Sequence, residues 1–207
     1  MSTIIWIMGL SGSGKTTTAN YVVQKLKQNG DNVVHLDGDD LRDALNQRAS
    51  YDQNDREKLA LSYARLSRLI AGQGPIVVVS SIGLYSGVQQ WLRENIDCYV
   101  EVFLDASMEL LISRDKRGIY SQDSAKSGPV VGKDFSPQYP QHPDVHIKLD
   151  GTVSVESCGE LVLNAFNTAR RNKSGRISNG SEAAVTRNCG NKRKSLHSKN
   201  RTLCESR

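Results

Sequence analysis

The sequence predicts an α/β fold, a three-layer sandwich in which helices cover both faces of a central parallel sheet. Short apolar runs bounded by Gly, Asp or Ser alternate with longer segments of helical period, a pattern typical of βαβ units. The first such turn is rich in glycine, as at the ligand-binding edge of these sheets. With 207 residues, the chain is long enough for one such domain with a substantial core.

The first half of the chain contains three predicted strands. Residues 4–8 (IIWIM) form the first and end at a glycine, residues 33–36 (VVHL) form the second and end at an aspartate, and residues 76–79 (IVVV) form the third. Helical periodicity predicts helices over residues 15–28 and 56–72. In the second helix an apolar stripe recurs on one face, which we interpret as core packing without a chemical role. The stripe consists of Leu59, Tyr63, Leu66 and Ile70.

The second half continues the alternation. Helices are predicted over residues 84–94 and 108–114, with a strand at 99–104 (YVEVFL) between them. A last strand at residues 145–149 and a helix at 155–169 close the domain. The predicted domain therefore spans residues 1–169.

Two segments break this rhythm. Residues 115–144 are rich in Gly, Ser, Pro, Lys and Gln, and we interpret their first part, residues 115–135, as a functional lid. Residues 170–207 have few large apolar side chains and carry 11 Lys and Arg against 2 acidic residues, which predicts a basic, disordered tail. The domain before it holds 16 basic and 20 acidic residues, so the positive charge belongs to the tail.

Residues 9–16 (GLSGSGKT) fit the phosphate-loop (P-loop) pattern G-x-x-x-x-G-K-[ST], between the first strand and the first helix. Glycines let backbone N–H groups curl around phosphate oxygens, and the helix start adds a positive end. Lys15 should reach the β- and γ-phosphates, and Thr16 should ligate Mg²⁺. A glycine-rich turn without a ligand would not need Lys and Thr in register. We therefore expect ATP or GTP with Mg²⁺, held by Gly9, Ser11, Gly12, Ser13, Gly14, Lys15, Thr16 and Thr17.

The segment LDGDDLRDAL follows the second strand and places Asp37, Asp39 and Arg42 at its carboxyl end. Ligands of open α/β sheets bind at this edge. A carboxylate there could accept the proton of an attacking hydroxyl or hold the water shell of Mg²⁺, and Arg42 could clamp an anionic acceptor. Taken alone, D-G-D is equally well explained as a turn before a capped helix. Its position after the second strand favours the functional interpretation.

Five separated blocks resemble the adenylylsulfate kinases in order and spacing, over about residues 3–150. They read GLSGSGKTT, LDGDDLR, DREKLALSYARLSRLIAGQG, EVFLDASMELLISRDKRGIY and VVGKDFSPQYPQHPDVHI. The resemblance implies a P-loop kinase of sulfate activation. Such an enzyme is a phosphotransferase that moves the γ-phosphate of ATP to an alcohol group, the ribose 3′-hydroxyl of adenosine 5′-phosphosulfate (adenylylsulfate).

The same resemblance implies roles for residues of this chain. Lys15, Asp37 and Asp39 become the catalytic candidates, with Asp37 also organising Mg²⁺ through water. Arg114 and the lid would close over ATP and exclude water. The acceptor would contact Asp39, Arg42, Arg56, Ile82, Tyr85, Lys133 and Phe135, of which Tyr85 and Phe135 are the candidates for gripping its base.

Several departures from the family pattern fall on the acceptor side. Where the family usually reads D-R-x-E-N-I-R-R, residues 55–62 read DREKLALS, so the Asn and the paired arginines are absent. Where it usually reads F-I-S-P-Y-R, residues 81–86 read SIGLYS. Gly83 thus replaces a serine that can be phosphorylated in some members, so we expect direct in-line transfer. Ser86 replaces an arginine that could meet the acceptor. The alternative acceptor is cytidine diphosphoramidate, whose kinase in surface-sugar phosphoramidate synthesis resembles this family.

Other classes of function are less well supported by the sequence. A regulatory nucleotide-binding protein would have a degraded lid or lack the acid after the second strand. Nucleic acid is not expected as a partner, since no aromatic residues interleave the charges of the tail. Scattered cysteines and the absence of an apolar stretch near ~20 residues favour a cytoplasmic protein without a membrane span. The expected partner is a small-molecule nucleotide, and a homodimer is left open.

Overall fold

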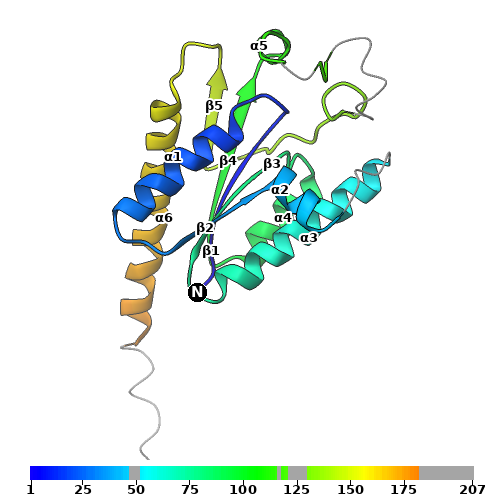
Figure 1. Ribbon diagram of the computed structural model, residues 1–207. Helices are drawn as coiled ribbons and strands as arrows, with labels where there is room; N and C mark the ends of the chain where they lie inside the picture. The colour runs from blue at the N-terminus through cyan, green and yellow to red at the C-terminus, as the bar shows by residue number, and fades with distance from the viewer. Residues whose placement is uncertain (47–51, 116–117, 121–129, 182–207) are drawn as a thin grey trace, which may run out of the picture. The chain divides into compact units, whose positions relative to one another are not determined.

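The computed structural model describes residues 1–46, 52–115, 118–120 and 130–181, and within them five parallel strands form one sheet in the order β2-β3-β1-β4-β5 (Figure 1). The strands are β1 (Thr3–Gly9), β2 (Val33–Asp37), β3 (Ile76–Ser81), β4 (Cys98–Ala106) and β5 (Val145–Leu149). The helices are α1 (Lys15–Gln28), α2 (Gly38–Ala44), α3 (Gln53–Ala71), α4 (Ser86–Asn95), α5 (Met108–Ser113) and α6 (Val155–Ser181).

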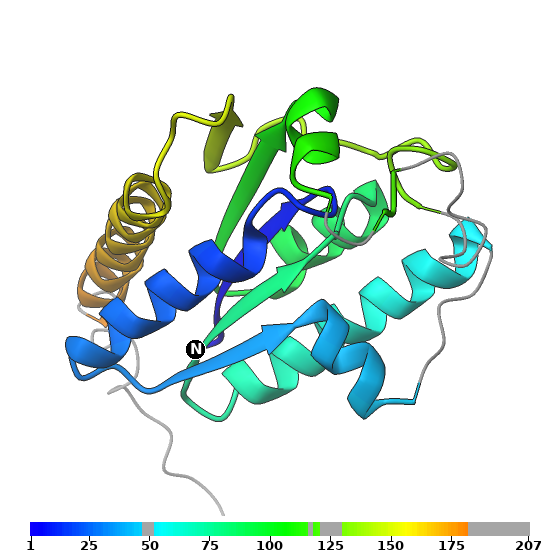
Figure 2. The same cartoon turned by 45° about the horizontal axis from the view of Figure 1, so that its top comes forward.

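Helices cover the sheet on both faces (Figures 1 and 2). On one face, Ile5 and Ile7 of β1 pack in a core cluster with side chains of α1 and α6, such as Val22 and Phe166. On the other face, the alternate β1 side chains, including Trp6, pack with residues of α3 and α4. Since β1 is buried on both faces, its sequence is a continuous apolar run and not an alternating one.

All five predicted strands are confirmed, and four of them extend beyond the predicted residues. At the carboxyl ends of β2 and β3 the extension is polar, with Asp37 paired with Ser80 in the parallel register. A hydropathy pattern stops at the first polar residue, whereas backbone pairing continues as long as the neighbouring strand does. The three-layer α/β fold predicted from the sequence is confirmed.

Most helix boundaries lie within two residues of the prediction, and the two that differ by more do so for identifiable reasons. The helix α3 begins at Gln53, three residues earlier than expected, because the Asp52 side chain caps it by accepting a hydrogen bond from the backbone N–H of Asn54 (3.2 Å). The helix α6 continues to Ser181, past the predicted end at residue 169. Arg170 pairs with Asp31 (2.9 Å) and lies over the Phe166 ring, which ties it to the compact unit Met1–Lys173.

The predicted lid and tail are described only in part. Of residues 115–135, the structure describes Asp115, residues 118–120 and residues 130–135. Residues 170–181 of the predicted disordered tail are helical, and a second unit begins at Ser174. Residues 182–207 lie outside the described residues.

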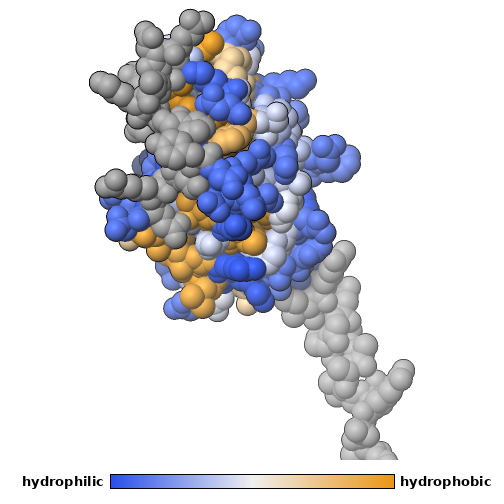
Figure 3. All heavy atoms as spheres, turned by 90° about the vertical axis from the view of Figure 1, so that its right-hand side faces the viewer, coloured by the Kyte–Doolittle hydropathy of each residue, from blue (hydrophilic) through white to orange (hydrophobic). Residues whose placement is uncertain are grey.

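The surface over α3 is mostly hydrophilic. Figure 3 shows this side, where the apolar side chains gather toward the lower part of the molecule. Leu69 of α3 is 65% exposed and is one of the large apolar side chains left in contact with solvent. Within the described residues, no helix is both long enough and apolar enough to cross a membrane.

Candidate active site

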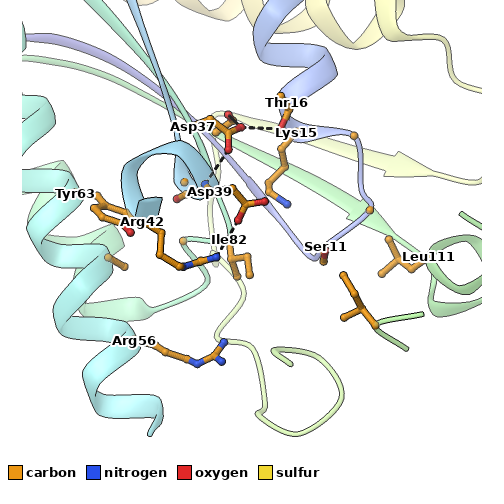
Figure 4. A pocket seen from close by; sticks show the side chains of 18 of the residues that line it. Ser11, Lys15, Thr16, Asp37, Asp39, Arg42, Arg56, Tyr63, Ile82 and Leu111 are labelled. Carbon is orange, nitrogen blue, oxygen red and sulfur yellow. Dashed lines mark hydrogen bonds and ion pairs between the residues drawn. The ribbon is translucent and has the colours of Figure 1, made fainter. Parts of the chain in front are cut away.

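A cavity of about 560 Å³ opens at the carboxyl ends of β2 and β3, between the phosphate loop, α2 and α3 (Figure 4). It brings together most of the residues singled out from the sequence. The lining residues are Ser11, Gly12, Gly14, Lys15, Thr16, Thr17, Asp37, Gly38, Asp39, Arg42, Arg56, Leu59, Ala60, Tyr63, Ser80, Ser81, Ile82, Gly83, Tyr85, Leu111, Arg114, Asp115, Ile119 and Tyr120.

Four of the predicted site residues do not line this cavity. Gly9 and Ser13 belong to the phosphate loop but do not line the cavity, and a Cβ on Gly9 would come within 2.7 Å of the Ser13 hydroxyl. Phe135 instead contacts Arg56, whose guanidinium lies over its ring at 5.6 Å from the centroid. Lys133 sits in the same turn as Phe135, and its N–H donates to the Val130 carbonyl (3.2 Å). Phe135 therefore stands near the acceptor side without lining it.

The phosphate loop has the geometry that an anion requires. Gly12 and Gly14 adopt positive φ angles of 82° and 90°, which a residue with a side chain would find strained. Gly14 is also the N-cap residue of α1, which has no side-chain cap and no acidic residue in its first turn. The N–H groups of that turn are thus left for a ligand, and a phosphate would satisfy them.

Lys15 lies at the centre of the loop. Its ammonium group donates to the Leu10 carbonyl (2.8 Å), which holds the side chain across the loop. Burial lowers its pKa to about 8, although the neighbouring carboxylates of Asp39 and Asp37 oppose the shift. A half-buried cation with too little negative charge around it is suited to a polyphosphate, which would supply that charge.

The Asp37 side chain accepts three hydrogen bonds (Figure 4). Its Oδ2 accepts from the hydroxyls of Thr16 and Ser80, both at 2.7 Å, and its Oδ1 accepts from the backbone N–H of Asp39 at 2.9 Å. Burial raises the pKa of Asp37, but these hydrogen bonds outweigh it and leave the pKa below its ordinary value. Asp37 is therefore ionised. It caps α2 and at the same time holds the Thr16 and Ser80 hydroxyls in the site.

The Thr16 and Asp37 pair suits a hard cation. The Thr16 hydroxyl donates its hydrogen to Asp37, so the lone pairs of its oxygen are available to a metal ion. Hydroxyl and carboxylate oxygens are ligands that Mg²⁺ prefers. The Ser80 hydroxyl also donates its hydrogen to Asp37. Since it has no second hydrogen to donate, it accepts a hydrogen bond from Nε2 of His35 (2.9 Å). Sequence analysis did not identify Ser80, since nothing in the run IVVVSS distinguishes it from strand packing.

Asp39 and Arg42 form an ion pair at 2.9 Å, one turn apart on α2, and both point into the cavity (Figure 4). Asp39 lies on the side of Lys15, and its charge acts on the pKa of that lysine. Arg42 reaches toward Ile82. The carboxylate and guanidinium therefore stand between the phosphate loop and the opposite wall of the cavity.

Gly83 has no room for a side chain. Its φ angle is +55°, and a Cβ added there would lie 2.5 Å from Nε1 of the fully buried Trp6. A serine at this position would clash with the indole ring. The absence of the family's phosphorylatable serine thus has a steric basis in Trp6, which in the sequence is one residue of the first predicted strand.

The described ends of the predicted lid reach the phosphate loop. The Tyr120 hydroxyl donates to the Ser11 carbonyl (2.9 Å), and the Tyr120 N–H donates to the Asp115 carboxylate (2.6 Å). Arg114 lines the same end of the cavity. Sequence analysis included Tyr120 in a motif but gave it no role.

Comparisons with known proteins agree with this geometry. Residues 1–148 match the family model described as adenylylsulphate kinase. Over 161 residues the chain is 36% identical to the cytidine diphosphoramidate kinase of Campylobacter jejuni, covering 77% of this chain and 94% of that relative. Over 160 residues it is 33% identical to a probable adenylyl-sulfate kinase of Synechocystis, covering 76% and 89%.

A solved structure is similar as well. The Mycobacterium tuberculosis APS kinase CysC, in complex with AMPPNP and APS, superposes with a TM-score of 0.72 at 28% identity, over 80% of this chain and 98% of that one. The fold and the family predicted from the sequence are both confirmed. The chain belongs to the adenylylsulphate kinase family, P-loop phosphotransferases whose acceptor is a hydroxyl group.

Proposed function

We propose that this chain transfers the γ-phosphate of ATP to the ribose 3′-hydroxyl of adenylylsulfate or of a closely analogous nucleotide. The observation that carries the proposal is the convergence in one cavity of a phosphate loop with Asp37, Asp39 and Arg42. The phosphate loop would bind the donor, and Asp39 and Arg42 would bind the acceptor. Because both sets of residues line one cavity, they support direct transfer between two bound nucleotides.

The donor side would hold ATP with Mg²⁺. Backbone N–H groups of the loop would bind the phosphates, Lys15 would contact the β- and γ-phosphates, and Thr16, with Asp37 acting through water, would hold the cation. When bound, Mg²⁺ neutralises charge on the transferring group and orients it. The hydrogen bond that already joins Thr16 to Asp37 supports this assignment.

On the acceptor side, Asp39 accepts the proton of the attacking 3′-hydroxyl, and Arg42 binds an anionic group of the acceptor. Asp39 lines the cavity between Lys15 and Arg42, whereas Asp37 is held by Thr16 and Ser80, which favours Asp39 for this role. Lys15 stabilises charge that develops on the transferring phosphoryl group. Arg114 and the lid exclude water, which prevents hydrolysis in place of transfer.

Cytidine diphosphoramidate is a second candidate acceptor, favoured by two observations. The kinase of this compound from Campylobacter jejuni is 36% identical to the chain. The polar residues that the family usually carries are replaced by Leu59, Leu61 and Ser86. A charged hydrogen bond contributes roughly 1.5 to 3 kcal/mol, so losing several would weaken binding of a phosphosulfate by orders of magnitude.

The decisive experiment is a coupled ADP-release assay with ATP and Mg²⁺ that compares adenylylsulfate and cytidine diphosphoramidate at equal concentration. Preferred turnover of one assigns the acceptor, and the assay without acceptor measures background hydrolysis. Tight ATP binding without turnover of either compound would refute the kinase proposal and favour a regulatory nucleotide-binding protein.

The proposal keeps the cellular setting predicted from the sequence, a cytoplasmic enzyme with a small-molecule nucleotide as its partner. A homodimer remains a prediction. Sedimentation velocity of the full chain measures it directly.

A further inference from the structure

Several buried polar atoms have no hydrogen-bond partner among the described residues, and they are not scattered at random. They are Trp6 Nε1, Ser13 Oγ, Arg42 Nε, the Tyr63 hydroxyl and Ser81 Oγ. The last three belong to residues that line the active-site cavity. We call Arg42, Tyr63 and Ser81 the acceptor wall.

The acceptor wall is assembled from three separate elements. Arg42 comes from α2, Tyr63 from α3 and Ser81 from the end of β3. Figure 4 shows Tyr63 projecting from α3 beside Arg42, on the side of the cavity away from the phosphate loop. The Tyr63 and Ser81 side chains are only 4% and 6% exposed. Three elements therefore contribute residues with unpaired polar atoms to the lining of one cavity.

Unpaired buried hydroxyls are unusual enough to need a physical reason, because each costs folding free energy that a partner would recover. Packing alone does not provide that reason, since phenylalanine would fill the space of Tyr63 without an orphan hydroxyl. Three other described tyrosines, Tyr21, Tyr99 and Tyr120, have hydrogen-bond partners for their hydroxyls. The Tyr99 hydroxyl donates to Glu101 (3.1 Å), and the Tyr21 hydroxyl donates to Glu160 (2.9 Å).

The surroundings of Tyr63 connect it to the reacting groups. Burial raises its pKa, Arg42 opposes the shift and Asp39 adds to it, so all three groups lie within electrostatic reach. Tyr63 is thus a neutral phenol that can both donate and accept. Ser81 is a second hydroxyl with the same versatility, and it stands where the family usually has a phenylalanine.

The position of Arg42 explains why the hydroxyls of the acceptor wall are buried before the acceptor binds. Its guanidinium is drawn toward Asp39 by the 2.9 Å ion pair, and its charge acts on the pKa of Tyr63. An anionic acceptor would compete with Asp39 for Arg42. Movement of Arg42 onto the acceptor would open the wall and release Asp39 to act as a base.

We propose that Tyr63 and Ser81 determine acceptor specificity, and that the bound acceptor supplies the hydrogen-bond partners that the acceptor wall lacks. This inference rests on the proposed kinase function. The wall offers one obligate donor, the Arg42 Nε–H, and two hydroxyls that donate or accept. It therefore fits a polar group of the acceptor nucleotide that accepts from the Arg42 Nε–H and exchanges hydrogen bonds with the two hydroxyls.

The test uses Tyr63→Phe and Ser81→Ala in the full chain, with saturating ATP and with adenylylsulfate and cytidine diphosphoramidate each as acceptor. For the acceptor that the wild type turns over, KM should rise about threefold to tenfold in each variant, as expected for one lost neutral hydrogen bond. The KM for ATP should stay within about twofold of wild type. The melting temperature without ligand should not fall, because an unpaired hydroxyl is removed.

Tyr99→Phe is the matched control, because its hydroxyl is partnered and lies outside the cavity. It should lower the melting temperature and leave the acceptor KM unchanged. If Tyr63→Phe behaves in the same way, Tyr63 is a structural residue and the inference is overturned. If the wild type phosphorylates neither acceptor, the proposed function fails first and the inference fails with it.

Discussion

The phosphate loop and the acceptor wall line the same cavity, but the lysine and threonine that the loop presents to it have hydrogen-bond partners that the two hydroxyls of the wall lack. Lys15 and Thr16 already have partners in the Leu10 carbonyl and Asp37. In the acceptor wall, Tyr63 has no partner among the described residues. The loop also follows a pattern shared by many nucleotide-binding proteins, whereas the acceptor side departs from its own family.

This difference shows how one fold can keep the same phosphate donor and change its acceptor. The donor side is fixed by the chemistry of triphosphate and Mg²⁺, which is the same in every reaction of this class. The acceptor side has to recognise only one compound, so its residues are free to differ as long as a base and a cation remain. Function within such a family is therefore decided by the acceptor side.

The largest effect is expected from the donor side. Lys15→Ala should lower kcat by about 10²- to 10⁴-fold, because it removes the buried cation that stabilises the transferring phosphoryl group. Steady-state kinetics with saturating nucleotides measure this. Lys25→Ala, on the same helix but outside the cavity, should leave kcat unchanged. Turnover near wild type in Lys15→Ala would refute the phosphate-loop assignment.

Asp39 lies between the donor side and the acceptor side of the cavity. Its substitution should therefore affect phosphoryl transfer without affecting ATP binding. Asp39→Asn should retain ATP binding and lower kcat by about 10²- to 10³-fold, because the amide cannot accept the proton of the hydroxyl. Titration calorimetry and ADP release measure the two quantities. Asp40→Asn, one residue along α2 and not lining the cavity, is the control. Retained transfer in Asp39→Asn would move the role of base to Asp37.

Substitution of Gly83 tests the steric restriction imposed by Trp6. Gly83→Ala should destabilise the protein by about 2 to 4 kcal/mol, from backbone strain combined with the clash against Trp6. Gly30→Ala is a matched control, because Gly30 also has positive φ but open space around it. Urea unfolding should give only about 1 kcal/mol there. Equal losses in both variants would mean that Trp6 is no obstacle.

The pH dependence of ATP binding reports on Lys15. In the free protein its pKa is lowered to about 8, and bound phosphates should raise it again. Between pH 8 and 9.5, ATP binding should therefore take up a proton and weaken by up to about tenfold per pH unit, whereas it should be flat below pH 7.5. Calorimetry in two buffers of different ionisation enthalpy measures the proton uptake. Lys15→Arg keeps its charge and should remove the dependence, and a proton uptake that persists in this variant would assign it to another group.

Removal of the tail should have the smallest effect. A chain that ends at Lys173 keeps the compact unit and should retain kcat within about twofold. A chain that ends at Ala169 also loses the Arg170–Asp31 pair and should melt about 1–2 °C lower. A large loss of kcat in the first truncation would show that the tail serves the reaction.

The sequence predicted the strands and the phosphate loop well for a physical reason. Strands buried on both faces are apolar throughout, and a phosphate loop needs glycines, a lysine and a hydroxyl at fixed spacing. Asp37 was likewise identifiable, since it follows an apolar strand directly. These are features in which the chemistry constrains neighbouring residues of the chain.

Other parts of the site depend on contacts between distant segments and could not be predicted. Tyr63 belongs to an apolar helical stripe and is indistinguishable in sequence from a core residue. Ser80 acquires its role only because the parallel register places it beside Asp37. The extension of α6 past residue 169 likewise depends in part on Arg170 meeting Asp31, a residue 139 positions away.

The packing of Gly83 against Trp6 also constrains the order in which mutations can accumulate. A chain with Trp6 cannot acquire a serine at position 83 in one step, because the intermediate would carry both the clash and the backbone strain. Trp6 must first become smaller, a change that would leave a cavity in the core and gain nothing by itself. The two positions are thus epistatic, and a return to a phosphorylatable serine has to pass through an intermediate sequence whose folding stability is lower.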